Sequence, residues 1–386
     1  MRRDARRASR ARCRSSLLAR HPATRRASTA RLTPRAVHRY SRVVPPTTLR
    51  AIALFAVLAF SPGAGAQDQA HAPGSEWKLS TALGPAYPQG KAGEIWATLI
   101  RERSKGRLNA GLYPGAALAQ RDPGREFAAL RDGAIDLAVG SATSWALQVK
   151  ELNLFALPWL IPDADALAAL LRSDVAGTLE ERVRAAGVEP LAWAADGFRE
   201  LATRREVHTP ADLAGLRLRV APSPLLVDTL LGLAAVPASM EAANALQAYA
   251  HGTLDGETIS VAAYATSRLH ASGYTRLLLW GAHAEVLLFA INRARWDTLS
   301  EPDRELVHQA ARDAAEQAAT LARRASEPAT LAELGRYGVT VTRLTPAGKQ
   351  PFRAQAKTAY DRWAAVVGED VVRAAETIVA TPRSAR

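Results

Sequence analysis

The sequence is poor in the residues that usually build metal centres and disulfides. It has 386 residues, one cysteine and two methionines, and its eight histidines are scattered without the spacing of a zinc site. The cysteine, Cys13, lies near the start of the chain, so residues 67–386 contain none. That part of the chain therefore forms no disulfide and offers no thiolate to a metal. We predict no metal and no other cofactor.

Sequence signatures of common enzyme classes are absent as well. The chain has no G-x-S-x-G elbow, no H-E-x-x-H pair, no G-x-x-x-x-G-K-[ST] phosphate loop and no G-x-G-x-x-G after an expected strand. Asp255 and Glu257 lie two residues apart and could act as paired carboxylates in acid–base catalysis. Because Asp255 is followed by glycine, the simpler interpretation makes both of them turn and loop residues. We therefore predict no catalytic residue.

Excess positive charge is confined to one end of the chain. The formal net charge is +13, but residues 1–50 contain 15 arginines, no lysine and one acidic residue. The other residues hold 35 basic and 36 acidic side chains, so their charge is close to zero. The main body is therefore not expected to bind nucleic acid.

The most apolar run is too short to cross a membrane. Residues 51–60 form a run of ten apolar residues, whereas a spanning helix needs about 20. The run follows Arg50 and precedes Ala64-Gly65-Ala66. A positive flank, a short apolar core and an A-x-A site predict a signal peptide over residues 51–66, cleaved near Ala66. Residues 1–50 are interpreted as an arginine-rich extension, either a mis-assigned start of the reading frame or a real basic arm.

The first part of the exported body alternates strands and helices. We expect strands at residues 77–82, 108–113 and 135–139, separated by helices that end near residues 104 and 131. This alternation predicts an α/β fold with a mainly parallel sheet and helical crossovers.

The later part continues the pattern and ends in helices. The expected strands lie near residues 190–194, 216–220, 276–280 and 286–291, and the expected closing helices at 345–367 and 369–379. Between them, Ser300 begins an alanine-rich helix that runs to about Arg324. Pro328 should break or kink that helix. A chain of this length has room for two lobes, and a cleft between lobes is a common ligand site.

The most informative stretch contains an arginine at the end of a strand. Thr209 can cap a short helix that begins with Pro210, and Gly215 can end it in a left-handed conformation. Residues 216–220 then alternate in polarity, which places Arg217 and Arg219 on one face of a strand. A buried arginine needs an anion. Arg219 therefore makes either an internal ion pair or a bidentate contact with a ligand carboxylate.

This stretch resembles the periplasmic solute-binding proteins of TRAP transporters, of the DctP type. The similarity extends over nearly all of residues 76–379 and includes YPGAALAQ, FAALRDGAIDLAVGS and the run Leu154 to Trp159. It implies a two-lobed periplasmic-binding-protein fold, class II-like, with a central ligand cleft and a long interlobe helix. The implied domains are residues 67–196 and 284–325 for the first lobe and the interlobe helix, and 197–283 and 326–386 for the second lobe and the closing helices.

The resemblance also implies the ligand-binding residues. In the family, the arginine that matches Arg219 binds the substrate carboxylate, and the one that matches Arg199 often reaches the ligand; Arg199 could equally pair with Glu200 or Glu206 on the surface. The remaining candidates are Tyr87, Ser141 and Trp145, which fall where loops of the first lobe face the cleft in the family, and Ile259. Tyr87, Ser141 and Trp145 each have a packing explanation as well, and for Trp145 burial in the core or at the rim is favoured over stacking on a ligand.

Departures from the family pattern bear on the ligand. Ala242 occupies a position that is often aromatic, Ile259 stands where sialic-acid binders have asparagine, and Asn244 stands where glutamate is usual. The carboxylate anchor is kept while the rest of the site is altered. We therefore expect an acid that is less polar than a sialic or sugar acid.

The function implied is capture of an organic acid and its delivery to membrane permease subunits, without catalysis. The alternatives are a periplasmic ligand-sensing subunit of the same fold and, third, a periplasmic enzyme that uses Asp255 and Glu257.

Overall fold

The computed structural model describes residues 76–381, and the fold is described for these residues only. They lie within one compact unit, Gln69–Arg386. The predicted extension over residues 1–50 and the predicted signal peptide at 51–66 lie outside the described residues. No helix between residues 76 and 381 is long and apolar enough to cross a bilayer.

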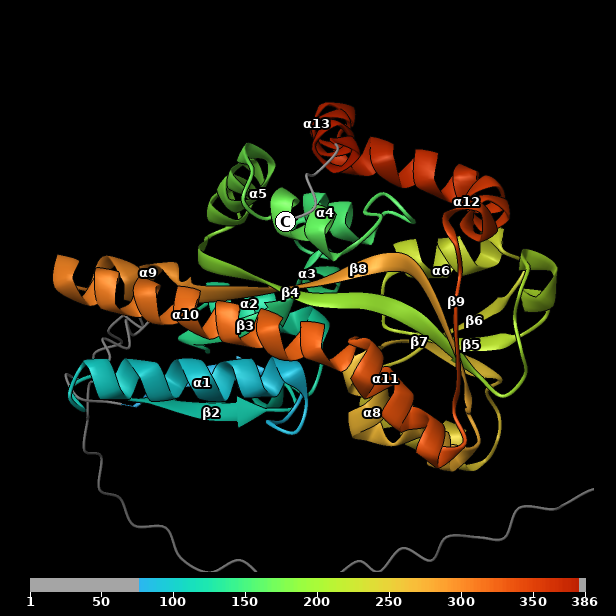
Figure 1. Ribbon diagram of the computed structural model, residues 1–386. Coiled ribbons are helices and arrows are strands. Elements are labelled where there is room, and N and C mark those ends of the chain that lie inside the picture. Colours follow the sequence, from blue (N-terminus) through green and yellow to red (C-terminus); the bar gives the residue numbers. More distant parts are fainter. Residues whose placement is uncertain (1–75, 382–386) are drawn as a thin grey trace, which may run out of the picture. The chain divides into compact units, whose positions relative to one another are not determined.

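The described residues form one mixed sheet with helices on both faces (Figure 1). Its strand order is β2-β1-β3-β8-β4-β7-β5-β6, and β9 pairs with β8. The strands are β1 (Trp77–Thr81), β2 (Ala110–Pro114), β3 (Leu137–Ser141), β4 (Val188–Thr203), β5 (Arg217–Val220), β6 (Val236–Ser239), β7 (Gly256–Ser260), β8 (Arg276–Asn292) and β9 (Thr340–Arg343).

The helices begin and end close to the expected residues. Pro88, Pro123 and Pro224 stand in the first turns of α1, α2 and α6, where a missing N–H costs nothing. The α-helices are α1 (Pro88–Arg103), α2 (Pro123–Arg131), α3 (Ala142–Trp145), α4 (Ala164–Leu170), α5 (Asp174–Ala185), α6 (Pro224–Gly232), α7 (Ala242–Ala250), α8 (Val261–Ser267), α9 (Arg293–Asp297), α10 (Glu301–Ala325), α11 (Pro328–Leu334), α12 (Pro346–Val367) and α13 (Glu369–Ala380).

The parallel pairing expected of the first strands is present, and the sheet as a whole is mixed. Strands β1, β2 and β3 are parallel, as are β5, β6 and β7. The two long strands β4 and β8 pair antiparallel with each other, and they join these two parallel groups through antiparallel contacts with β7 and β3.

Both long strands exceed the predicted lengths. Residues 190–194 are a segment of β4, and the two strands expected at 276–280 and 286–291 are one strand, β8. Gly281, at φ 58°, lies between those two segments. β8 continues through Gly281, which donates its N–H to Glu200 on the neighbouring strand at 2.8 Å.

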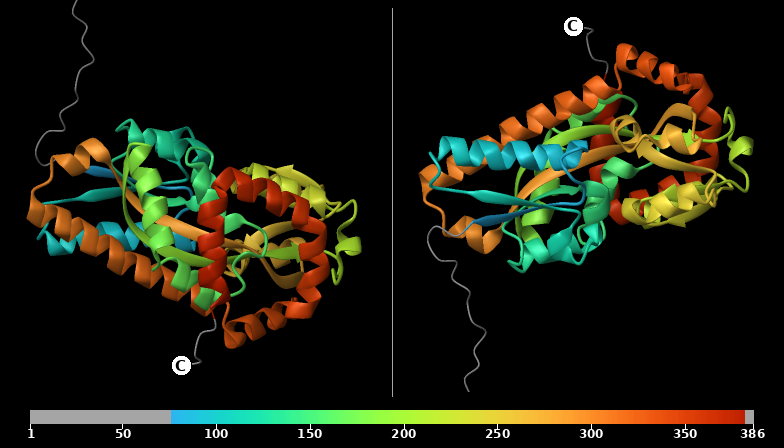
Figure 2. Two further views of the ribbon diagram at one scale, coloured as in Figure 1. Left: turned by 90° about the horizontal axis from the view of Figure 1, so that it is seen from above. Right: turned by 90° about the horizontal axis from the view of Figure 1, so that it is seen from below.

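The central strands are apolar on both faces because helices cover both. Leu287, Phe289 and Ile291 of β8 pack toward α1 and α10, which run side by side (Figure 2). Leu288 and Ala290 pack into the other core, to which α2, α5, α6, α12 and α13 contribute. A strand that is buried on both faces has a continuous run of apolar residues in its sequence.

The stretch before β5 folds as its sequence predicts. Thr209 and Asp212 form a capping box around a 3-10 turn at Pro210–Leu213, and Gly215 follows with φ 72°. Three hydrogen bonds to Asp212 from His208 and Thr209 hold the pKa of its carboxyl below the usual range. The long helix α10 ends at Ala325, and Pro328 begins α11, as expected of a helix-breaking proline.

Candidate functional site

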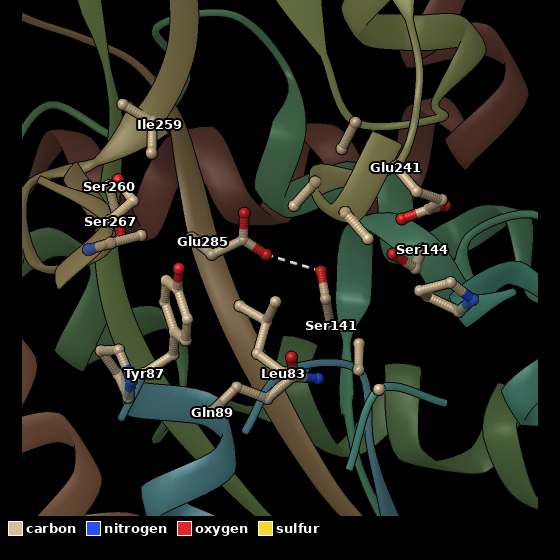
Figure 3. Close-up of a pocket in the computed structure, with 18 of the residues that line it drawn as sticks. Leu83, Tyr87, Gln89, Ser141, Ser144, Glu241, Ile259, Ser260, Ser267 and Glu285 are labelled. Atoms are coloured by element: carbon tan, nitrogen blue, oxygen red, sulfur yellow. Dashed lines mark hydrogen bonds between the residues drawn. The ribbon is translucent and has the colours of Figure 1, made fainter. Parts of the chain in front are cut away.

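A cavity of about 430 Å³ lies where β4, β5, β7 and β8 meet the loops after β1, β2 and β3 (Figure 3). Apolar groups such as Leu83, Ala242, Ile259 and Leu287 form part of its wall. The polar side chains that line it are Tyr87, Gln89, Arg121, Ser141, Ser144, Asp196, Arg199, Arg219, Glu241, Tyr249, Glu257, Ser260, Ser267 and Glu285. A concave site with a few charged groups is typical of a small-molecule pocket.

Arg219 reaches this cavity from β5 and is almost fully buried, with 5% of its surface exposed. Its Nη1 forms an ion pair with Glu257, which lies beside it on β7. Its Nε donates to the carbonyl oxygen of Met240, at 2.9 Å. Tyr249 donates its hydroxyl to the second oxygen of Glu257. Arg219 therefore makes the internal ion pair that was one of the two alternatives, and it also lines the cavity.

Arg199 makes a second buried ion pair, from β4. Its Nε lies 2.6 Å from Oε2 of Glu285, and its Nη1 donates to the carbonyl oxygen of Thr258 at 3.0 Å. Neither Glu200 nor Glu206, the surface partners considered from the sequence, is the partner. Glu200 is buried and instead accepts the N–H of Gly281.

Two of the predicted residues come from the first part of the chain. Ser141, at the end of β3, donates its hydroxyl to Oε1 of Glu285 at 2.5 Å, and Tyr87 stands near them at the start of α1 (Figure 3). Burial and the nearby charge of Glu257 raise the pKa of Tyr87, so its hydroxyl remains a hydrogen-bond donor at neutral pH. Residues from distant parts of the chain thus meet at one site.

Two further acids line the same cavity. Burial, reinforced by the charge of Glu285, raises the pKa of Asp196 to about 8. Burial also raises the pKa of Glu241, against the opposing effect of Arg219. The cavity therefore combines two paired arginines with acidic groups that resist ionisation.

Trp145 is the predicted site residue that does not line the cavity. Its ring is fully buried, packs edge-on against Phe127 and lies directly against Gly140. The family resemblance placed it near the cleft, but burial in the core was the favoured alternative, and its ring is indeed buried. Ile259 does line the cavity, as does Ala242, whereas Asn244 is exposed and lies outside it.

The carboxylates Asp255 and Glu257 do not form a catalytic pair. Asp255 accepts the backbone N–H of Arg217 and lies outside the cavity lining, while Glu257 is a buried strand residue paired with Arg219. The interpretation of Glu257 as a loop residue was wrong. Arg217 is exposed and pairs with Asp255 at 3.5 Å.

Three acidic residues of the cavity, Asp196, Glu241 and Glu285, were missed in the sequence. Glu285 carried the clearest signal, because it stands alone in the apolar run of β8. Asp196 precedes Gly197 at an irregularity in β4, where a side chain can be redirected. Between residues 76 and 381, no group of three or more His, Cys, Asp or Glu side chains is arranged to hold a metal ion.

Solved structures with the same fold are solute-binding proteins. A TRAP periplasmic solute-binding protein from Ralstonia eutropha H16, with bound (S)-2-acetolactate, is 44% identical with a TM-score of 0.77, over 79% of this chain and 98% of that one. A second, from Sulfurospirillum deleyianum with bound succinate, is 23% identical with a TM-score of 0.71, over 78% and 98% of the two chains. At 23% identity, the similarity to the Sulfurospirillum deleyianum protein supports the fold alone.

Sequence comparison agrees with the structural one. A solute-binding protein from Chromohalobacter salexigens is 25% identical over 284 residues, which is 72% of this chain and 82% of that protein. Residues 79–365 match the family described as bacterial extracellular solute-binding protein, family 7, or DctP. With its mixed α/β fold and its similarity to two-lobed proteins, the chain belongs to the DctP family of TRAP-transporter periplasmic solute-binding proteins.

Proposed function

We propose that this protein is the periplasmic component of a TRAP transporter that captures a small organic acid through Arg219 and Arg199. The observation that carries the proposal is that Arg219 and Arg199 both line one cavity of about 430 Å³. Among the hydrogen bonds within residues 76–381, the Nη2 group of neither arginine is a donor. These donors remain for a ligand carboxylate.

The internal ion pairs and ligand binding are compatible. The Arg219 guanidinium is held on one side by Glu257 and by the carbonyl oxygen of Met240. The Arg199 guanidinium is held in the same way by Glu285 and by the carbonyl oxygen of Thr258. A donor fixed before the ligand arrives loses little side-chain entropy on binding. The glutamates therefore orient the arginines.

The ligand we propose is a small monocarboxylate with an oxygen substituent near its carboxylate. The Ralstonia eutropha relative holds (S)-2-acetolactate, an acid of this kind. Ile259, Ala242 and Leu287 supply an apolar part of the wall, which suits the methyl groups of such an acid better than the hydroxyls of a sugar acid.

Export, closure and delivery complete the proposal. Cleavage near Ala66 releases the body into the periplasm. Because residues from separate parts of the chain line the cavity, a ligand that touches all of them favours the closed arrangement by its differential affinity. The closed protein then hands the acid to the membrane permease subunits of the transporter.

A thermal-shift panel on purified protein tests the ligand class. The protein is first unfolded and refolded to remove any bound acid, then mixed with (S)-2-acetolactate, 2-oxobutanoate, succinate and D-glucuronate. A ligand at a hundred times its dissociation constant adds about 2.7 kcal/mol of stability, which raises Tm by several degrees. We expect a shift with the first two acids. A shift confined to succinate or glucuronate, or no shift with any acid, contradicts the proposal.

A further inference from the structure

Asp196 occupies an irregular position in β4. The register of β4 against β8 shifts between Ala195 and Phe198, so Asp196 and Gly197 lie outside the regular ladder, and Gly197 has φ 87°. Irregularities of this kind redirect a side chain relative to the rest of the strand. Here the side chain of Asp196 joins the lining of the cavity.

This side chain has an unmet hydrogen-bonding group. Within residues 76–381, Oδ1 of Asp196 is buried and has no hydrogen-bond partner. The neighbouring acid, Glu285, accepts a hydrogen bond from Ser141 on Oε1 at 2.5 Å, and its Oε2 lies 2.6 Å from Nε of Arg199, so its charge is compensated by that cation. A buried polar atom without a partner is costly, and in a ligand cavity the partner can be the ligand.

Charge decides the protonation state of Asp196. Arg199, the nearest cation, is already paired with Glu285, so Asp196 faces one carboxylate without a cation of its own. Of two neighbouring carboxyl groups that share one cation, the unpaired one keeps its proton. Burial and Glu285 accordingly raise the pKa of Asp196 to about 8. A protonated carboxyl has an O–H donor, which an ionised one lacks.

We propose that Asp196 is a specificity-determining residue that donates a hydrogen bond to a keto or hydroxyl oxygen beside the ligand carboxylate. The inference rests on the proposed function, because Arg219 and Arg199 must hold that carboxylate. Asp196 thereby distinguishes oxygenated monocarboxylates from plain aliphatic acids of the same shape.

The other charged groups of the cavity add a second selection, against dicarboxylates. Glu241 and Glu257 line it together with Glu285, and Arg121, the remaining cation of the lining, is exposed. A second ligand carboxylate directed at Asp196 would meet acidic groups without a free buried arginine. Such a carboxylate is repelled by the acids and gains no ion pair.

Calorimetric titrations with a matched pair of acids test the role of Asp196. The probes are (S)-2-acetolactate and 2-methylbutanoate, which has the same carbon skeleton near the carboxylate but lacks both oxygen substituents. At pH 6.5 we expect the protein to prefer acetolactate by about tenfold or more, since a site built around a hydrogen bond loses at least that much without it. Asp196→Leu should remove most of this preference.

The pH profile separates hydrogen bonding from a structural effect. Between pH 6.5 and 9, Asp196 loses its proton, so the affinity for acetolactate should fall by about tenfold, the loss expected for a group with pKa about 8. Asp196→Asn keeps an N–H donor that does not titrate. This variant should keep the preference for acetolactate within about threefold and lose the pH dependence.

The outcomes distinguish this inference from the proposed function. The matched control is Asp165→Asn, an exposed aspartate of α4 outside the cavity lining, which should behave as the unmodified protein. Acetolactate binding with an unchanged preference in Asp196→Leu, or an unchanged pH profile in Asp196→Asn, overturns the role of Asp196 while the proposed function stands. If neither acid nor any member of the panel binds the unmodified protein, the role of Asp196 and the proposed function are both contradicted.

Discussion

At the scale of single residues, the site is governed by buried charge. Arg219 and Glu257 are each at most 5% exposed, and each is the other's charged partner. Removing one member of a buried pair leaves an uncompensated charge, whereas replacing both members can be nearly neutral. This difference allows the effect of Arg219 on folding to be separated from its effect on binding.

We predict that Arg219→Gln lowers the free energy of unfolding by about 3 kcal/mol or more, because Glu257 remains buried without its cation. The double variant R219Q/E257Q should recover most of that loss, since two amides can hydrogen-bond to each other and Tyr249 still finds an acceptor. Urea unfolding of both variants measures the difference. Equal destabilisation in the single and double variants would show that Glu257 is not the partner that matters.

The sequence indicated Arg219 and Arg199, which the structure places in the cavity lining, but not the acids that pair with them. Arg219 follows a capped turn and ends a short strand, and this local pattern is recognisable in the chain. Glu257 and Glu285 are adjacent to Arg219 and Arg199 only through pairing of strands that lie far apart in the sequence. Long-range pairing of this kind leaves no local signal. Ion pairs of these arginines could therefore be expected, but neither Glu257 nor Glu285 was identified as the partner.

At the scale of elements, the close packing of β3 and α3 positions the Ser141 loop. A Cβ built on Gly140 would lie 1.9 Å from the Trp145 ring, which is far inside contact distance. Trp145 therefore acts as a support beneath the cavity wall, and only glycine fits beside it. Trp145 was a candidate for the cleft, with burial in the core as the favoured alternative, and the structure shows it buried and outside the cavity lining.

We expect Gly140→Ala to destabilise the protein by about 2 kcal/mol or more, because a well-packed core has no room for the methyl group. Gly177→Ala is the matched control. It lies in α5 with no atom within 4 Å of its Cβ position, and alanine there should raise stability by up to about 1 kcal/mol. Chemical denaturation compares them, and a change of the same sign in both variants would refute the packing argument.

At the scale of the whole molecule, the two long strands make the site possible. β4 and β8 pass from the β1–β3 group to the β5–β7 group, and they carry Arg199, Asp196 and Glu285 on the way. The α/β class and the helices were predictable from hydrophobic periodicity. The continuity of these strands was not, because Gly197 and Gly281 resemble breaks in a linear sequence. The predicted lobe boundaries at residues 197 and 284 fall within β4 and β8 and remain predictions.

The most direct measurement of carboxylate capture is a calorimetric titration of (S)-2-acetolactate, the acid held by the 44% identical relative, into the unmodified protein and R219Q/E257Q. Far-ultraviolet circular dichroism and Tm establish that both proteins are folded. If Arg219 holds the carboxylate, the double variant binds at least about a hundredfold more weakly, a loss of about 2.7 kcal/mol. Equal affinity in the two proteins would contradict the assignment of Arg219 as the carboxylate anchor.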